Sequence, residues 1–319
     1  MTTQQQARQG PSDKGGRDRM DAPGAIGEVL VAGAGSIGIG VARSFARAGF
    51  RTAVLTRNPD RLAGRLPGVA LVAALPESPP GLVVESIPEQ RELKQALYAD
   101  IESAWGGAAI LATNTSSLPL EELSAGLRFP ARFLGTHYLY PADQMEFVEV
   151  MRTGATAADT LASVTDALRR CGKTPVVLQR PVMGALVNRL QHALLREAYH
   201  LIGEGVVTPE QVDDVARRLL APRMCVTGLL EQKDISGLDT HALAQRSLLP
   251  HLHNSAEPTP YLQDLYAKGE IGLKAGRGFY DWAGADPDRV RARATEKVGR
   301  ILAFMEEIGV GRGRGMDKP

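Results

Sequence analysis

A glycine-rich segment near the start of the 319-residue chain constrains the fold more than any other feature. It reads Val31-Ala-Gly-Ala-Gly-Ser-Ile-Gly38, which contains the pattern G-x-G-x-x-G. A Val-rich run (28–32) precedes it and a helical apolar pattern (37–48) follows it, which is the context of a dinucleotide-binding turn. The glycines permit a tight turn, a close approach to a pyrophosphate and tight packing of helix against strand. Free N–H groups at the helix start favour phosphate. The residues predicted to contact the cofactor here are Gly33, Gly35, Ser36, Ile37 and Gly38.

Further short apolar runs alternate with helical patterns up to residue 180. After 28–32, the predicted strands are 51–56, 69–73, 82–85, 109–113, 133–138, 147–150 and 175–178, and 89–101 is a predicted helix. This alternation predicts an α/β fold, a doubly wound parallel sheet of Rossmann type. From Val182 onward the apolar residues recur at helical spacing and no clear strand appears, so the second domain is predicted to be all-helical. Thr208 and Pro209 are typical of a helix start.

The length predicts roughly two domains. We expect a Rossmann domain over 25–180 and a helical domain over 181–305 that carries dimer and substrate contacts. The segment 1–24 is poor in apolar residues and is expected to be a disordered tail, with Met20 as an alternative start. The segment 306–319, rich in Gly and Arg, is expected to be a flexible tail.

Charge and cysteine content exclude several classes of function. Lys and Arg number 37 and Asp and Glu 36, so no charge excess indicates nucleic acid or an anionic membrane as partner. No run of 18 apolar residues predicts a membrane span. The only two cysteines, Cys171 and Cys225, exclude a disulfide scaffold or a Cys-rich zinc site and fit a reducing cytoplasm. His251 and His253 lack a third ligand at useful spacing, so no metal site is predicted.

The residues after the second predicted strand bear on the choice of cofactor. An NAD site usually places an acid here, because a carboxylate accepts hydrogen bonds from the ribose hydroxyls. The chain instead has Thr56-Arg57-Asn58, with no acid nearer than Asp60. Arg57 can pair with a 2′-phosphate, which favours NADP over NAD. The alternative is that Arg57 stacks on the adenine of NAD.

Later motifs carry a family resemblance. They are Val83-Val-Glu-Ser-Ile-Pro-Glu-Gln-Arg-Glu-Leu-Lys94, Thr113-Asn-Thr-Ser-Ser-Leu118, Gly135-Thr-His-Tyr-Leu-Tyr-Pro141 with Phe147-Val-Glu149, Val187-Asn-Arg-Leu190, and Gly272-Leu-Lys-Ala-Gly-Arg-Gly-Phe-Tyr280. Together with the glycine segment, and in this order, they resemble the 3-hydroxyacyl-CoA dehydrogenase family. The resemblance implies a Rossmann domain, a helical dimerising domain, a role in fatty acid metabolism, and reversible hydride transfer between a 3-hydroxyacyl thioester and NAD.

The same resemblance assigns roles to single residues. Ser116 matches the family's substrate-binding serine, His137 its catalytic histidine, and Glu149 the glutamate that pairs with it. Asn188 matches an asparagine that contacts substrate from the helical domain. Contacts to the dinucleotide are implied for Glu89, Lys94 and Lys274.

The chemistry of an alcohol oxidation fits these residue types. A histidine can take the hydroxyl proton as the hydride leaves and can return it in the reverse direction. A carboxylate such as Glu149 fixes the tautomer and stabilises the imidazolium. Ser116 and Asn188 can donate hydrogen bonds to the oxygen where negative charge develops.

Two departures from the family concern substrate recognition. Only about 25 residues separate Thr56 from Leu82, so the family's helical hairpin that contacts CoA is missing. Tyr140 replaces an asparagine near substrate and cofactor. A small 3-hydroxy acid or a carrier-bound acyl group is therefore a possible substrate besides acyl-CoA. Two other functions stay open: a dehydrogenase of the 6-phosphogluconate type, although the stretch 182–190 lacks the required lysine, and a non-catalytic dinucleotide-binding protein.

Overall fold

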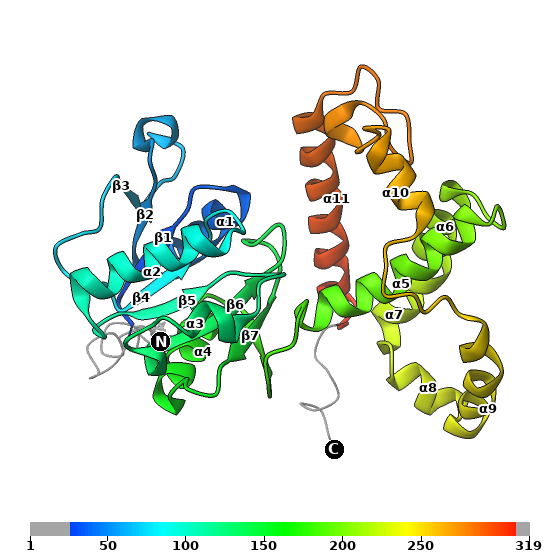
Figure 1. Ribbon diagram of the computed structural model, residues 1–319, viewed down its shortest axis with the longest axis horizontal. Coiled ribbons are helices and arrows are strands. Elements are labelled where there is room, and N and C mark those ends of the chain that lie inside the picture. Colours follow the sequence, from blue (N-terminus) through cyan, green and yellow to red (C-terminus); the bar gives the residue numbers. More distant parts are fainter. Residues whose placement is uncertain (1–25, 311–319) are drawn as a thin grey trace, which may run out of the picture. The chain divides into compact units, whose positions relative to one another are not determined.

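The computed structural model describes residues 26–310. The chain forms two compact units, of which the first ends at Asn188 and the second begins at Arg189 (Figure 1). The expected tail over 1–24, the alternative start at Met20 and the residues after 310 lie outside the described residues. Part of the expected C-terminal tail is described, and it belongs to a helix that continues to Glu307.

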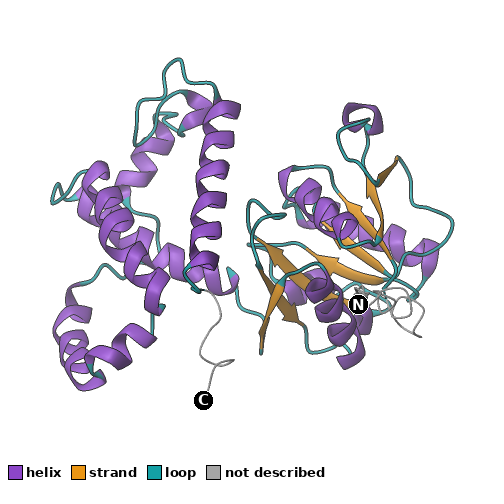
Figure 2. Cartoon of the chain, turned by 180° about the vertical axis from the view of Figure 1, so that it is seen from behind, coloured by secondary structure: helices purple, strands orange, loops and turns teal. Residues whose placement is uncertain are grey.

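The first unit contains a single eight-stranded sheet with helices on both of its faces (Figure 2). The strands are β1 (Glu28–Ala32), β2 (Arg51–Leu55), β3 (Val69–Val72), β4 (Leu82–Glu85), β5 (Ile110–Thr113), β6 (Phe133–Tyr138), β7 (Phe147–Arg152) and β8 (Thr174–Leu178). Their order across the sheet is β3-β2-β1-β4-β5-β6-β7-β8. All eight lie within two residues of the predicted ranges, and the Rossmann-type fold is confirmed.

The prediction that the whole sheet is parallel is wrong for its last two strands. Strands β1 to β6 are parallel, but β7 is antiparallel to β6, and β8 is parallel to β7. The connection from β6 to β7 spans only 139–146, and a parallel crossover needs a dozen residues or more. The short connection therefore reverses the chain, and it places β7 beside β6.

Alternate side chains of the strands enter two separate cores. Val29 and Val31 of β1 join the core beneath α1 (Ser36–Arg47) and α4 (Ala158–Arg170). Leu30 and Ala32 of the same strand join the core beneath α2 (Arg91–Trp105) and α3 (Leu120–Ser124). Because successive side chains of a strand point to opposite faces, a Val-rich and Leu-rich strand can be buried on both faces.

Beyond the sheet the described chain is helical, as predicted. The helices are α5 (Ala185–Gly203), α6 (Pro209–Val215), α7 (Ala221–Thr227), α8 (Glu231–Ser236), α9 (Leu238–Leu248), α10 (Pro260–Ala267) and α11 (Pro287–Glu307). Thr208 caps α6 as expected: its hydroxyl accepts from the Gln211 N–H, and the Gln211 side chain accepts from the Thr208 N–H. None of the helices in the described range has the length and apolar character needed to cross a bilayer.

Candidate active site

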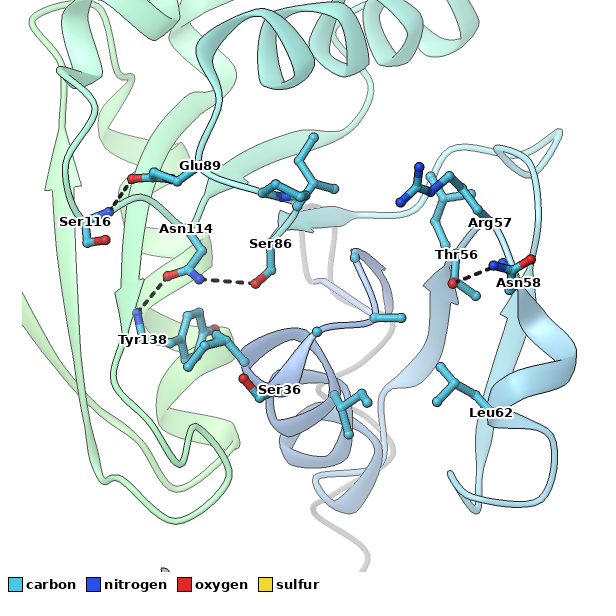
Figure 3. Close-up of a pocket in the computed structure, with 18 of the residues that line it drawn as sticks. Ser36, Thr56, Arg57, Asn58, Leu62, Ser86, Glu89, Asn114, Ser116 and Tyr138 are labelled. Atoms are coloured by element: carbon cyan, nitrogen blue, oxygen red, sulfur yellow. Dashed lines mark hydrogen bonds between the residues drawn. The ribbon is translucent and has the colours of Figure 1, made fainter. Parts of the chain in front are cut away.

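A cavity of about 970 Å³ lies in the first unit at the carboxyl ends of the parallel strands. Its wall comes from the residues that follow β1, β2, β4 and β5 and from the end of β6 (Figure 3). Ligands of open α/β sheets bind at this edge. The predicted residues Gly33, Gly35, Ser36, Ile37, Thr56, Arg57, Glu89, Ser116, His137 and Asn188 all line the cavity.

The glycine segment has the shape that a dinucleotide requires. Gly33 has φ +120°, and a Cβ there would overlap the carbonyl oxygen of Ser86. A Cβ on Gly38 would overlap the carbonyl oxygen of Gly33, so this glycine serves packing. A Cβ on Gly35 would meet nothing within 4 Å. Since no side chain caps the start of α1, its first N–H groups are available to phosphate oxygens beside this open space.

The end of the cavity after β2 is rich in cationic side chains. Arg57 lines it as predicted, and so do Arg61 and Arg65, which the sequence reading missed. The signal for them was their spacing, because arginines recur every fourth residue over a short turn (Pro59–Leu62) and the residues after it. Of the described residues that line the cavity, Glu89 alone carries a carboxylate, and it comes from the loop after β4.

Glu89 organises the loop that carries Ser116. Its Oε1 accepts a hydrogen bond from the backbone N–H of Ser116 at 2.9 Å (Figure 3). The same oxygen accepts from the Thr115 hydroxyl at 2.6 Å and from the backbone N–H of Ser117 at 3.0 Å. Burial opposes the charge, but these bonds and the nearby Lys94 ammonium lower the pKa of Glu89 to about 2. Glu89 is therefore ionised. It holds the backbone of Ser116 in place through the Ser116 N–H, and it does not bind the Ser116 hydroxyl.

Lys94 lies behind the cavity wall and is not part of it, which corrects the predicted direct contact with the dinucleotide. Its side chain is fully buried, and its Nζ donates to the two Glu85 oxygens at 2.7 and 2.9 Å. The same Nζ lies 3.3 Å from Oε2 of Glu89. Tyr98 and Thr113 donate to Glu85 as well. Lys94 therefore acts on the site through Glu89. Lys274 lies in the second unit on the turn Leu273–Ala275, and its contact with the dinucleotide stays a prediction.

His137 and Glu149 form a buried pair. They are direct cross-strand partners in the antiparallel register of β6 and β7, and His137 Nδ1 lies 2.6 Å from Oε2 of Glu149. Only 5% of His137 and 2% of Glu149 are exposed. Because Nδ1 is bound to the carboxylate and His137 lines the cavity, Nε2 is the nitrogen available for a proton transfer.

The second oxygen of Glu149 binds the start of α5. Its Oε1 accepts from the backbone N–H groups of Leu186 at 2.6 Å and Val187 at 3.0 Å. One carboxylate thus orients the histidine and caps the helix that carries Asn188. Asn188 is the fourth residue of α5 and therefore lies in the first turn of this helix. No pattern in the sequence pointed to this cap, since the partners are 37 residues apart.

Tyr140, which departs from the family motif, has a half-exposed side chain and does not line the cavity. No group of three His, Cys, Asp or Glu side chains within the described range is placed to bind a metal ion. The polar side chains that line the cavity include His137, Ser116 and Asn188 as well as the cationic end, and Glu149 pairs with His137.

Comparisons with known proteins find matches in both units of the described chain. The family model "3-hydroxyacyl-CoA dehydrogenase, NAD binding domain" matches residues 77–181, and the model of the C-terminal domain of the same enzyme matches residues 184–282. A probable 3-hydroxybutyryl-CoA dehydrogenase from Bacillus subtilis is 31% identical over 81% of this chain and 98% of its own length. The 5-formyl-3-hydroxy-2-methylpyridine 4-carboxylate 5-dehydrogenase from Mesorhizobium japonicum is 28% identical over 87% of this chain and 97% of its length.

Solved structures give the same picture. The crystal structure of a 5-formyl-3-hydroxy-2-methylpyridine 4-carboxylic acid 5-dehydrogenase, described as an NAD⁺-dependent dismutase, has a TM-score of 0.83 and 26% identity, covering 88% of this chain and 99% of that one. A 3-hydroxyacyl-CoA dehydrogenase from Archaeoglobus fulgidus has a TM-score of 0.63 and 30% identity, covering 86% and 99%.

Proposed function

Since the chain belongs to the 3-hydroxyacyl-CoA dehydrogenase family, whose activity is the NAD-dependent oxidation of a CH–OH group, we propose that His137 is the general acid and base of this reaction. The observation that carries the proposal is the pair of His137 and Glu149, which presents Nε2 to the same cavity as the glycine segment. An enzyme that moves a proton and a hydride in one reaction needs a general base and a dinucleotide site. The His137–Glu149 pair can supply the first and the glycine segment the second.

Each side chain has a defined task in this proposal. When bound, a nicotinamide dinucleotide accepts the hydride in the oxidation and supplies it in the reduction. His137 takes the hydroxyl proton on Nε2 and returns it in the reverse direction. Glu149 holds Nδ1 as the protonated nitrogen and stabilises the imidazolium. Ser116 and Asn188 line the cavity beside His137 and donate to the substrate oxygen as charge develops there.

A substrate without CoA is favoured by the segment between β2 and β4. It contains a short 3-10 turn (Pro59–Leu62) and β3, with no helical hairpin in this fully described stretch. The relative from M. japonicum, by its name, acts on a pyridine carboxylate, a compound without CoA. We therefore propose that the substrate is a small or carrier-bound 3-hydroxy or 3-oxo compound.

The cationic end of the cavity supports NADP as the preferred cofactor. Arg57, Arg61 and Arg65 line the end of the cavity that follows β2, and an NAD enzyme places an acid after this strand. Among the described residues that line this end, three carry guanidinium groups and none carries a carboxylate, which favours a 2′-phosphate.

We also propose that the protein is a cytoplasmic homodimer. The described cysteines, Cys171 and Cys225, form no disulfide, which fits a reducing compartment. Leu229, Leu230, Leu238 and Leu248 of the helical unit have exposed side chains, and Leu230 is 78% exposed. An apolar surface of this kind is typical of a protein interface.

The test is turnover with NADH and NADPH on matched sets of 3-oxo substrates. Each acyl group is offered as the free acid, as the N-acetylcysteamine thioester and as the CoA thioester. We expect turnover, with the CoA thioester no better than the N-acetylcysteamine thioester and with NADPH preferred. Tight cofactor binding without turnover of any substrate would contradict the proposal and favour a non-catalytic dinucleotide-binding protein.

A further inference from the structure

We propose that a second, smaller cavity beside Ser116 binds the carbon skeleton of the substrate and limits its size. This inference rests on the proposed function, because it places the reacting carbon at His137. The cavity has a volume of about 180 Å³ and lies in the first unit. Ser116 lines it and also lines the cofactor cavity, so the two spaces meet at this serine.

The wall of the small cavity is mainly apolar. It is formed by the loop after β5, the start of α3, one residue of β7 and the loop before α5. The lining residues are Thr115, Ser116, Leu118, Pro119, Leu120, Glu121, Met151, Pro181, Val182, Met183, Gly184 and Ala185. Leu120, Met151 and Ala185 are buried in the core beneath α3. An apolar wall fixed by the core selects apolar groups by size.

The polar groups of the small cavity determine how a substrate is oriented in it. Ser116 stands where the cavity meets the cofactor site, so a polar end of the substrate belongs there. Glu121 is the one carboxylate of the lining, and its Oε1 accepts from the Gly154 N–H at 3.3 Å. A carboxylate at the wall disfavours an anionic tail, since like charges repel and no described cation lines this cavity.

The volume sets the size of the group. A dry apolar cavity of about 150 Å³ holds a benzene molecule. The cavity beside Ser116 therefore fits an uncharged group of about six carbon atoms, a ring or a short chain. The substrate class that follows is a 3-hydroxy compound with a short, uncharged apolar group beyond the reacting carbon, and long-chain acyl groups are excluded.

A chain-length series tests the inference. The substrates are N-acetylcysteamine thioesters of 3-oxo acids from four to twelve carbons. Each methylene that enters the cavity should raise kcat/KM about fourfold. We expect kcat/KM to rise to an optimum near about nine carbons, the three of the 3-oxo head and six in the cavity, and to fall beyond it.

Val182 is the residue for a matched set of variants. Val182→Phe fills part of the cavity and should move the optimum to shorter chains by two or more carbons, whereas Val182→Ala should move it to longer chains. Leu93→Phe changes an exposed residue of α2 that lines neither cavity and should leave the profile unchanged. Equal profiles in the wild type and both Val182 variants would overturn the inference, as would a kcat/KM that rises through twelve carbons.

A binding measurement separates this inference from the proposed function. Trifluorotoluene, followed by ¹⁹F NMR, should bind the wild type saturably and lose at least about tenfold in affinity in Val182→Phe. If no thioester turns over, the proposed function fails. The NMR result still shows whether the small cavity binds an apolar group. Binding that is absent, or equal in the wild type and Val182→Phe, would overturn the inference even in an active enzyme.

Discussion

Arg57 illustrates how one side chain bears on cofactor choice. It stands where a carboxylate would bind the ribose hydroxyls of NAD, and Arg61 and Arg65 line the same end of the cavity. A charge-assisted contact between arginine and phosphate is worth about 1.5–3 kcal/mol. Arg57→Asp should therefore raise the KM for NADPH roughly ten- to a hundredfold and improve NADH. Steady-state kinetics with both cofactors give the answer. If Arg57 stacks on adenine instead, the wild type prefers NADH and the substitution affects both cofactors alike.

Glu89 contributes to stability through its ionised form. The pKa of this carboxyl is lowered from 4.5 to about 2 in the folded protein, so ionised Glu89 stabilises the fold above pH 4.5. This contribution is lost as the pH falls from 4.5 toward 2. Glu89→Gln should be less stable than the wild type at pH 7, and the difference should shrink through that window. Unfolding by urea at a series of pH values measures it. A difference that is constant with pH would show that Glu89 acts through packing rather than charge.

Among the elements, β6, β7 and the start of α5 are joined by one carboxylate. Glu149 binds His137 with one oxygen and two backbone N–H groups of α5 with the other. A charge at a helix N-terminus stabilises the helix by about 0.3–1 kcal/mol, and more when buried. The helix start in turn holds the carboxylate in place for the histidine. The proton relay and the position of Asn188 therefore depend on the same group.

Glu149→Gln tests this double role. An amide has only one accepting oxygen, so when that oxygen accepts from the helix, the amide NH2 can only donate to Nδ1 of His137. The imidazole proton then lies on Nε2, which is the wrong tautomer for a general base. We expect kcat to fall about tenfold, less than for loss of His137 itself, with the affinity for cofactor kept and the Tm lowered. Glu146→Gln, an exposed residue just before β7, serves as the control and should leave kcat unchanged. An unchanged kcat in Glu149→Gln would limit Glu149 to a structural role.

The elements also show which features the sequence can predict. The strands are short Val-rich and Leu-rich runs between glycines and helical patterns, so their positions follow from local composition. The reversed direction of β7 follows from the short connection between β6 and β7. The alternation of strands and helices along the sequence does not reveal this reversal. The burial of Lys94 under Glu85 and Glu89 and the capping of α5 by Glu149 depend on contacts distant in sequence, and only the folded chain brings these groups together. Similarity of motifs could identify Lys94 as important but not as a buried residue.

At the scale of the whole molecule, the exposed leucines of the second unit lead to a prediction about assembly. Leu229, Leu230, Leu238 and Leu248 would remain in water in a monomer. Burying such side chains gains about 1.5–3 kcal/mol each, so a second copy of the chain is favoured. Size-exclusion chromatography with light scattering at micromolar concentration should give a dimer, and Leu230→Glu should shift it toward monomer. A monomer of the wild type at that concentration would defeat the prediction.

The proposed reaction depends on one histidine. His137 is buried against Glu149 and lines the cavity that holds the glycine segment. The measurement that tests this most directly is turnover and cofactor affinity of His137→Ala, compared with the wild type and with His192→Ala, an exposed histidine of α5. We predict that His137→Ala binds the cofactor as tightly as the wild type and loses at least about a hundredfold in kcat, the magnitude expected for a general acid and base, while His192→Ala stays active. A kcat of His137→Ala close to that of the wild type would contradict the account.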